Sequence, residues 1–335
     1  MRFLTLVGLF AGLALTGYLI SLHDLGAIWG SLATMGWGFL LLPLVYLPTI
    51  GIDSQCFRLI FPPDRKPPYW WVVWGTFVAR GVNTLLPVAT LGGEVVKARI
   101  LIQGGSPGVL VGAGVVVDKT VQTVSLGLWG LIGLGALFLL EAEGGIARGA
   151  AIATIGLGVG AAGFILAQRA GALGSLARRL QSLLGARTGD RMARVVDVAS
   201  RSDEALRDTY RRPWRFVAAV FLMIVSRIFL ALEVWLVAHL IGLPLGFLEA
   251  LMLKSLTGVI RGAFFVVPSG IGVQESGFVL LGAMFGWPAE AMLAVSLATR
   301  GREILLGIPG LVGWQIAESR ALAGRISRRP PEAEE

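Results

Sequence analysis

Two stretches of this sequence place an arginine and a glutamate on either side of a break that contains proline and glycine. They cover residues 80–94 and 261–275, and both follow the pattern R-G-x5-P-x6-E. The surrounding sequence is apolar, so burying these charges is costly unless they are paired or hydrated. Arginine is suited to bidentate binding of a phosphate or carboxylate, and a glutamate can balance charge or carry a proton. A costly pattern that occurs twice at one spacing indicates a function.

Further charged residues lie in the apolar segments that follow each stretch. Asp118 and Lys119 are adjacent, so they point about 100° apart on a helix, and we expect at least one to face a polar cavity. Arg300 and Arg302 occupy a loosely comparable place in the second half of the chain. These charges predict one buried polar cavity shared by the two halves.

Two interpretations of the repeated stretch are open. In the first, salt bridges within each copy pin the breaks. In the second, the charges line a substrate path, which agrees with the rule that non-helical backbone at membrane depth needs protein or a water-filled cavity beside it. The candidate substrate-binding residues are Arg80, Asn83, Glu94, Asp118, Arg261, Glu275 and Arg300. The candidate hairpin tips are Pro87, Gly92, Gly93, Pro268, Gly270 and Gly272.

Three other charges have no evident partner. Asp53 lies near the inner end of its predicted helix, where it either reaches the interface or faces the cavity. Arg227 and Glu233 are six residues apart, a poor spacing for a direct pair on a helix, so each needs a partner elsewhere.

Composition indicates the class of protein. Of 335 residues, 55% are hydrophobic and 15% are charged, against about 25% charged in soluble domains. With several apolar runs of about 20 residues, this predicts a polytopic all-α membrane protein. The formal charge of +8 comes from arginines in loops, which is the positive-inside pattern and not a nucleic-acid signature. One cysteine and two histidines leave no metal cluster. We expect no cofactor, and without a nucleophile–base constellation we expect no enzyme.

Apolar runs and breaks divide the chain into four parts. These are an N-terminal membrane half (1–168), a basic connector (169–213), a C-terminal membrane half (214–318) and a partly disordered tail (319–335). The connector is rich in arginine. It is either an amphipathic segment on anionic lipid headgroups or an ordinary cytoplasmic connector. The predicted membrane segments are 3–20, 37–57, 69–87, 94–101, 109–140, 147–166, 216–241, 248–267, 276–285 and 289–316.

Charge in the loops constrains the topology. The basic turn near residue 65 should lie inside and the acidic loop at 141–143 outside, so an odd number of crossings separates them. One solution is a re-entrant hairpin followed by one full crossing. The same count of crossings in the second half would make its hairpin enter the membrane from the opposite side. The result is about six full crossings plus two inverted broken-helix repeats. Three full crossings in each half satisfy the same parity.

At these residues the sequence resembles the flippase-like integral membrane family that includes the transmembrane region of lysylphosphatidylglycerol synthases. Its first pattern is matched by Arg80, Asn83, Pro87, Gly92, Gly93 and Glu94. Its second is matched by Pro268, Gly270, Gly272 and Glu275, with Arg300 downstream. The resemblance covers roughly residues 35–318. Length and the Trp- and Gly-rich start are also similar to a branch associated with hopanoid biosynthesis.

The resemblance implies lipid translocation or an accessory role in lipid modification. The chain ends at Glu335, shortly after its last predicted helix, so we expect no aminoacyl-transferring domain. We predict a bacterial inner-membrane flippase with both termini in the cytoplasm and a membrane lipid, for example a hopanoid or its precursor, as substrate. The alternative is a non-transporting scaffold that holds lipid-biosynthesis enzymes at the membrane.

Overall fold

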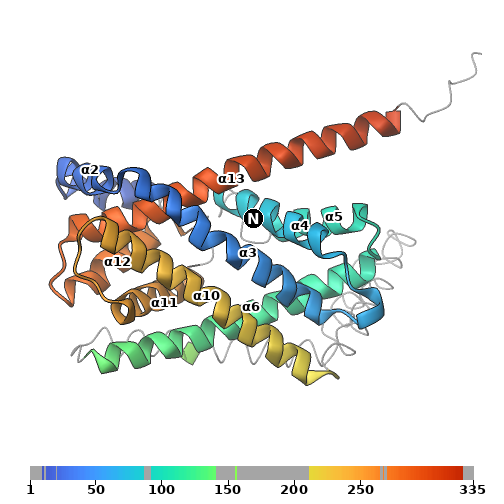
Figure 1. Ribbon diagram of the computed structural model, residues 1–335, viewed down its shortest axis with the longest axis horizontal. Helices are drawn as coiled ribbons and strands as arrows, with labels where there is room; N and C mark the ends of the chain where they lie inside the picture. Colours follow the sequence, from blue (N-terminus) through green and yellow to red (C-terminus); the bar gives the residue numbers. More distant parts are fainter. Residues whose placement is uncertain are drawn as a thin grey trace, which may run out of the picture.

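The computed structural model describes residues 10, 13–19, 21–86, 92–140, 155–156, 211–264, 267 and 270–326. Within these residues the chain forms α-helices and two short 3₁₀ helices, with no strand (Figure 1). The elements are α2 (Leu25–Thr34), η1 (Gly36–Leu40), α3 (Leu41–Ile60), η2 (Pro63–Arg65), α4 (Tyr69–Leu85), α5 (Gly92–Gln103), α6 (Gly108–Leu139), α10 (Pro213–Leu240), α11 (Phe247–Ala263), α12 (Val273–Ala283) and α13 (Ala289–Ile326).

The prediction of an all-α polytopic membrane protein is confirmed. Among the described helical stretches, Gly36–Ile60, Gly108–Leu139 and Pro213–Leu240 are long and apolar enough to cross a membrane. Prolines mark where several helices begin: Pro68 precedes α4, Pro107 precedes α6, and Pro213 is the first residue of α10. Proline suits these positions because its missing N–H would have no partner in the first turn.

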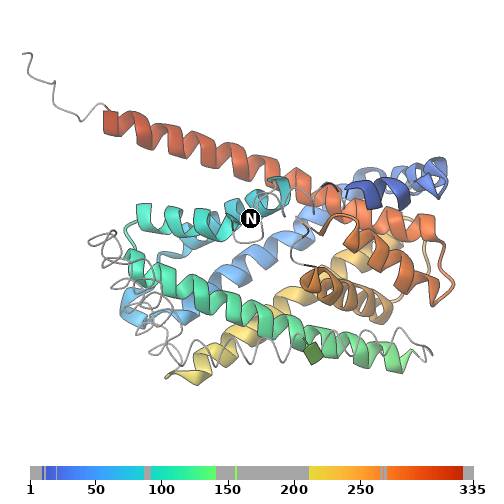
Figure 2. The ribbon, with the colours of Figure 1, turned by 180° about the vertical axis from the view of Figure 1, so that it is seen from behind.

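The two halves have the same order of helices. The elements α3, α4, α5 and α6 are matched by α10, α11, α12 and α13, each set being a long helix, a broken pair and another long helix. Packing follows the same correspondence, because α4 packs on α13 while α11 packs on α6, and α3 and α10 pack on each other. The α4–α5 pair lies toward one end of the long axis and the α11–α12 pair toward the other (Figures 1 and 2). The two broken pairs therefore lie at opposite ends of the bundle.

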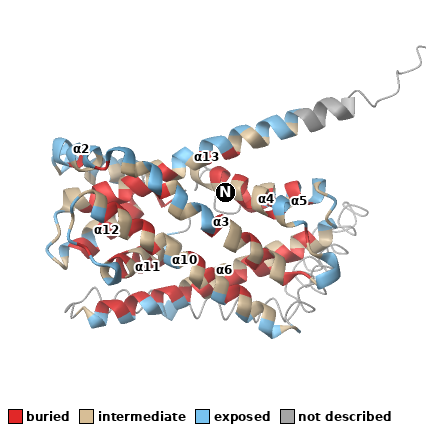
Figure 3. Cartoon of the chain, in the orientation of Figure 1, coloured by how far each residue is buried: buried red, intermediate tan, exposed pale blue. Residues whose placement is uncertain are grey.

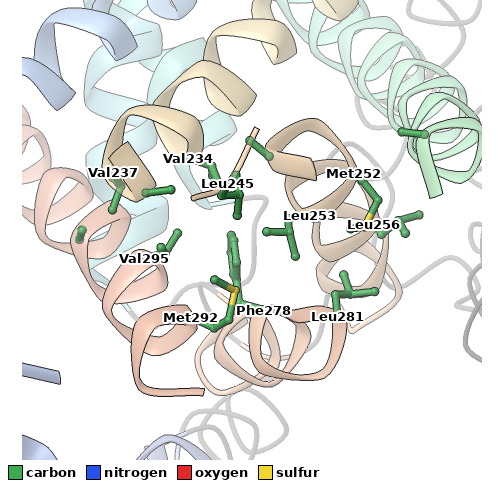
Figure 4. Close-up of a cluster of buried hydrophobic side chains, with 14 of the residues drawn as sticks. Val234, Val237, Leu245, Met252, Leu253, Leu256, Phe278, Leu281, Met292 and Val295 are labelled. Atoms are coloured by element: carbon green, nitrogen blue, oxygen red, sulfur yellow. The ribbon is translucent and has the colours of Figure 1, made fainter. Parts of the chain in front are cut away.

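Buried residues follow the inward helix faces (Figure 3) and form two main apolar cores. One core joins the ends of α6 and α10 to α11, α12 and the start of α13, with Phe278 among its buried members (Figure 4). The other joins the end of α3 to α5 and the starts of α6 and α10. Along α10, Met223 belongs to the second core and Val234 to the first, with Arg227 between them. Charged residues thus lie between two apolar ends.

Two helix predictions need correction. The loop predicted after residue 20 contains α2, whose start is capped by Asp24 accepting a hydrogen bond from the Gly26 N–H at 2.7 Å. This helix is apolar but has only ten residues, so it is too short to be recognised as a membrane segment. The last helix was predicted to end at Ile316 but extends to Ile326. Glu318 forms an ion pair there with Arg99 of α5. The tail predicted from residue 319 therefore begins as helix.

Several predictions fall outside the described residues. They concern most of the first apolar run, Pro87, Pro268, the acidic loop at 141–143, nearly all of the membrane segment predicted at 147–166, the connector up to residue 210, and the tail from residue 327.

The glycine of each R-G motif lies where two helices cross. A Cβ atom on Gly81 of α4 would lie 2.8 Å from the backbone oxygen of Gly307 in α13. A Cβ on Gly262 of α11 would lie 2.7 Å from Cδ2 of Leu126 in α6. These contacts are equivalent in register, since Gly262 follows Gly81 by 181 residues and Gly307 follows Leu126 by the same 181. Small residues at such crossings let membrane helices approach closely.

This difference in neighbours predicts unequal costs for the same substitution. Gly81→Ala should destabilise the protein by about 1–3 kcal/mol, because the added methyl meets backbone and the helices must separate. Gly262→Ala should cost much less, because the end of the Leu126 side chain can rotate away. Thermal unfolding of the two variants in the same detergent checks this. Equal losses would contradict the described crossing.

Candidate functional site

A cavity of about 500 Å³ lies where the two halves meet, and all eight helices of the two repeats contribute to its wall. Its volume falls within the range of about 300–1,000 Å³ typical of ligand pockets. Its lining is unusually rich in charge for a membrane protein. The cations are Arg80, Lys97, Lys119, Arg227, Lys254, Arg261 and Arg302. The carboxylates are Asp53, Glu94, Asp118 and Glu303.

In the first half, α5 and α6 are joined by four interlocked charges. The Glu94 carboxylate lies 2.8 Å from Nζ of Lys97 and 2.8 Å from Nζ of Lys119. Lys97 also reaches Asp118 at 2.9 Å, and Gln122 donates to the same carboxylate at 3.0 Å. Glu94, Lys97 and Asp118 are buried. We expected at least one of Asp118 and Lys119 to face the cavity, and both line it.

In the second half, α12 and α13 are joined by Glu275 and Arg300. Arg300 Nε lies 2.8 Å from the carboxylate, and its Nη2 donates to the carbonyl oxygen of Gly270 at 2.9 Å. The carboxylate also accepts the Gly272 N–H at 2.7 Å, at the first turn of α12. One arginine thus connects the hairpin tip, the start of α12 and α13.

These two ion pairs occupy the same register. Lys119 follows Glu94 by 25 residues, and Arg300 follows Glu275 by the same 25. In each half, the glutamate after the break binds a cation on the next long helix. The repeat is therefore longer than the R-G-x5-P-x6-E pattern, and Lys119, not Asp118, is the counterpart of Arg300.

The interpretation that salt bridges form within each copy is wrong. Arg80 forms an ion pair with Asp53 and donates to Thr49 Oγ1 at 2.8 Å, because α4 packs against α3. Asp53 therefore faces the cavity instead of the interface. Arg261 donates to Gln274 at 3.0 Å and lies 3.6 Å from Glu303.

The structure also places the partners that Arg227 and Glu233 needed. Glu233 receives a bidentate pair of hydrogen bonds from Arg302, at 2.7 and 2.8 Å, with both side chains almost fully buried. The Arg302 guanidinium carbon lies 3.6 Å from the centre of the Tyr46 ring. Arg227 donates to the Gln122 carbonyl oxygen and to Ser125 Oγ, each at 3.2 Å.

The glycines at the breaks are needed for close contact and unusual backbone. The Gly93 N–H donates to Asn83 Oδ1 at 2.8 Å, and a Cβ there would collide with the carbonyl oxygen of Ala79. Asn83 therefore positions the tip as well as lining the cavity. Gly270 has φ +59° and lies against the Arg261 side chain, which leaves no space for a Cβ. Left-handed backbone of this kind favours glycine.

Sequence reasoning missed several wall residues. Lys97 could have been found from its i, i+3 spacing to Glu94. Glu303 corresponds to Gln122 across the repeat, since the two are 181 residues apart. The only sequence signal for Lys254 was that a charged residue lies within an apolar run. Among the described residues, no group of His, Cys, Asp and Glu could hold a metal ion.

A family model described as "Lysylphosphatidylglycerol synthase TM region" matches residues 6–310. The chain belongs to this family. The match runs through both broken-helix repeats and every helix that lines the cavity. No curated protein and no solved structure matches the chain. Membership in the lysylphosphatidylglycerol synthase TM region family confirms the resemblance inferred from the two motifs.

The Glu233–Arg302 pair offers a test of how the charges stabilise this member of the family. Removing one partner of a buried pair costs about 3–5 kcal/mol, whereas replacing both with apolar groups is often near neutral. Glu233→Gln should therefore lower thermal stability strongly, and Glu233→Leu with Arg302→Met should recover most of the loss.

Asp64 provides the control, because its contact with Arg65 is exposed on both sides. Asp64→Asn should leave stability nearly unchanged. A double variant no more stable than Glu233→Gln would show that the pair does more than neutralise charge.

Proposed function

We propose that this protein moves an amphiphilic lipid between the two leaflets, with the polar head passing through the cavity. The observation that carries this proposal is the charged cavity of about 500 Å³ inside a bundle whose outer faces are apolar. Exposed side chains on α10 and α13, such as Val217, Phe221, Ile308 and Val312, suit contact with lipid tails. The proposed role is transport and not catalysis.

The lengths of the hairpin helices support re-entrant hairpins. At 1.5 Å per residue, the 12 residues of α5 and the 11 of α12 span about 18 and 17 Å. A hydrocarbon core is about 30 Å thick. Neither helix is long enough to cross it, so we propose that each break ends inside the membrane, as in transporters built from inverted repeats.

Charge supports the orientation. The last turn of α3 carries Arg58, and the loop after it carries Arg65 and Lys66. We therefore propose that this end of α3 faces the cytoplasm of a bacterial inner membrane, with both termini on that side. The opposite turn, at residues 242–246, carries no charge. The arginine-rich connector would contact anionic headgroups on the cytoplasmic leaflet.

Single cysteines test the hairpin geometry. The native Cys56 is buried and is the only cysteine, so it should not react with a membrane-impermeant maleimide. Arg65→Cys should be labelled from the cytoplasmic side alone and Pro244→Cys from the other side alone. Leu86→Cys, at the end of α4, should be labelled from neither side by a bulky reagent. Labelling of Leu86→Cys from the Pro244 side would instead support fully crossing hairpins.

Leaflet exchange tests the function itself. Purified protein in liposomes should accelerate the exchange of a fluorescent phospholipid measured by dithionite quenching. Arg80→Ala and Arg261→Ala should each slow it about tenfold or more, equivalent to about 1.4 kcal/mol in barrier height. Arg65→Ala, on the exposed turn, is the control and should be as fast as wild type.

If Arg80→Ala and Arg261→Ala both exchange lipid as fast as wild type, Arg80 and Arg261 are not part of the substrate path. No exchange with any lipid would favour the scaffold alternative, in which lipid-biosynthesis enzymes would co-purify. A hopanoid polyol with a fluorescent label, used as a second cargo, tests the assignment to the hopanoid branch.

A further inference from the structure

The charges of the cavity are distributed unequally between the two halves. In the first half, the cations Arg80, Lys97 and Lys119 are matched by Asp53, Glu94 and Asp118. In the second half, the wall carries the cations Arg227, Lys254, Arg261 and Arg302 against one carboxylate, Glu303. Glu233 lies behind Arg302 and neutralises it. Two positive charges on the described wall are still not balanced.

Arg227 is one source of this excess. Its hydrogen bonds go to a backbone carbonyl and a serine hydroxyl, which are neutral. Its Nε is buried and has no partner among the described residues. The guanidinium therefore retains donor capacity and a full charge toward the cavity.

Lys254 is the other source. Its ammonium group lines the cavity and makes no hydrogen bond or ion pair with any residue that the structure describes. The carboxylates whose charge acts on it, Glu233 and Glu303, form ion pairs with Arg302 and Arg261 instead. The hydroxyl of Thr257, one turn further along α11, is likewise buried without a partner within the described chain. A cation and a hydroxyl on one helix face, both without partners, form a site that an anionic oxygen can satisfy.

The same face of α11 continues toward the break. Lys254, Thr257 and Arg261 stand at positions i, i+3 and i+7, so they share one stripe, and all three line the cavity. Lys254 and Arg261 are separated by about 10.5 Å along the helix axis. Gly258, which lies between them, and Gly262, which follows Arg261, add no side chain to the wall. The stripe therefore offers two successive positions for an anion.

We propose that the cargo of this cavity is an amphiphile whose head carries a net negative charge, such as a phosphodiester, and that Lys254 and Arg227 select it. This rests on the proposed function, because it names the class of lipid that the path accepts. A head with a net positive charge would meet the unbalanced cations directly. Lysylphosphatidylglycerol, the lipid in the family name, carries two ammonium groups and one phosphate. The cargo proposed for this chain is therefore a different lipid.

Three acyl-labelled lipids with identical tails test the proposal in liposomes that contain the full chain. They are phosphatidylglycerol, phosphatidylcholine and the lysyl ester of phosphatidylglycerol, with net charges of −1, 0 and +1. Wild type should exchange the anionic lipid about tenfold or more faster than the cationic one. Lys254→Gln and Arg227→Gln should lose most of this preference, whereas the control Arg65→Gln should keep it. Equal exchange of all three lipids by wild type would overturn the charge selection and leave lipid translocation intact.

A binding measurement keeps the test independent of transport. Dihexanoyl phosphatidylglycerol should raise the melting temperature of the detergent-solubilised protein, and Lys254→Gln should abolish the rise. If no lipid is exchanged but this rise occurs, the anionic site stands and the proposed function fails. The absence of a rise with wild type would overturn the site. Inorganic phosphate that stabilises the protein as strongly as the lipid would show a site for a free anion and overturn the lipid assignment.

Discussion

The cost of placing charge in an apolar environment governs this structure. Four carboxylates are buried among the described residues, and each binds a cation on another helix: Glu94 with Lys119, Asp118 with Lys97, Glu233 with Arg302, and Glu275 with Arg300. Removing Arg302 or Arg300 would leave Glu233 or Glu275 buried without the cation that binds it, whereas Glu94 and Asp118 share two lysines. These pairs therefore determine which helices must remain together. They join α5 to α6, α12 to α13 and α10 to α13.

The repeat explains how two short helices can be held inside a bundle that spans a membrane. The helices α5 and α12 have only 12 and 11 residues, and each is attached to the long helix that follows it. The Glu94–Lys119 and Glu275–Arg300 pairs supply that attachment at the same register in both halves. The R-G glycines at 81 and 262 supply the second contact, since they let each broken pair pack against a long helix of the other half. One sequence pattern thus serves both the attachment and the crossing.

Much of this arrangement could be predicted from the sequence, because it depends on local signals. Apolar runs, prolines and glycines located most helices within a few residues. The spacing of arginine, proline and glutamate located both breaks. The ion-pair partners could not be predicted, because they depend on which helices pack together. Arg80 and Glu94 are close in sequence, yet Arg80 reaches α3 while Glu94 reaches α6. The ten residues of α2 were missed because a short helix leaves too little periodicity to recognise.

A scaffold with two equivalent halves does not require an even distribution of charge. The helix order, the crossing glycines and the attaching ion pairs obey the repeat, whereas Asp53, Arg227 and Lys254 do not. The first group maintains the shape of the bundle, so a change in one half must suit its counterpart. The second group lines the cavity, where the two halves meet. Among the residues that line the cavity, the excess of cations lies in the second half alone. The position of the positive charge in the cavity is thus set by the residues that break the symmetry, and not by the fold.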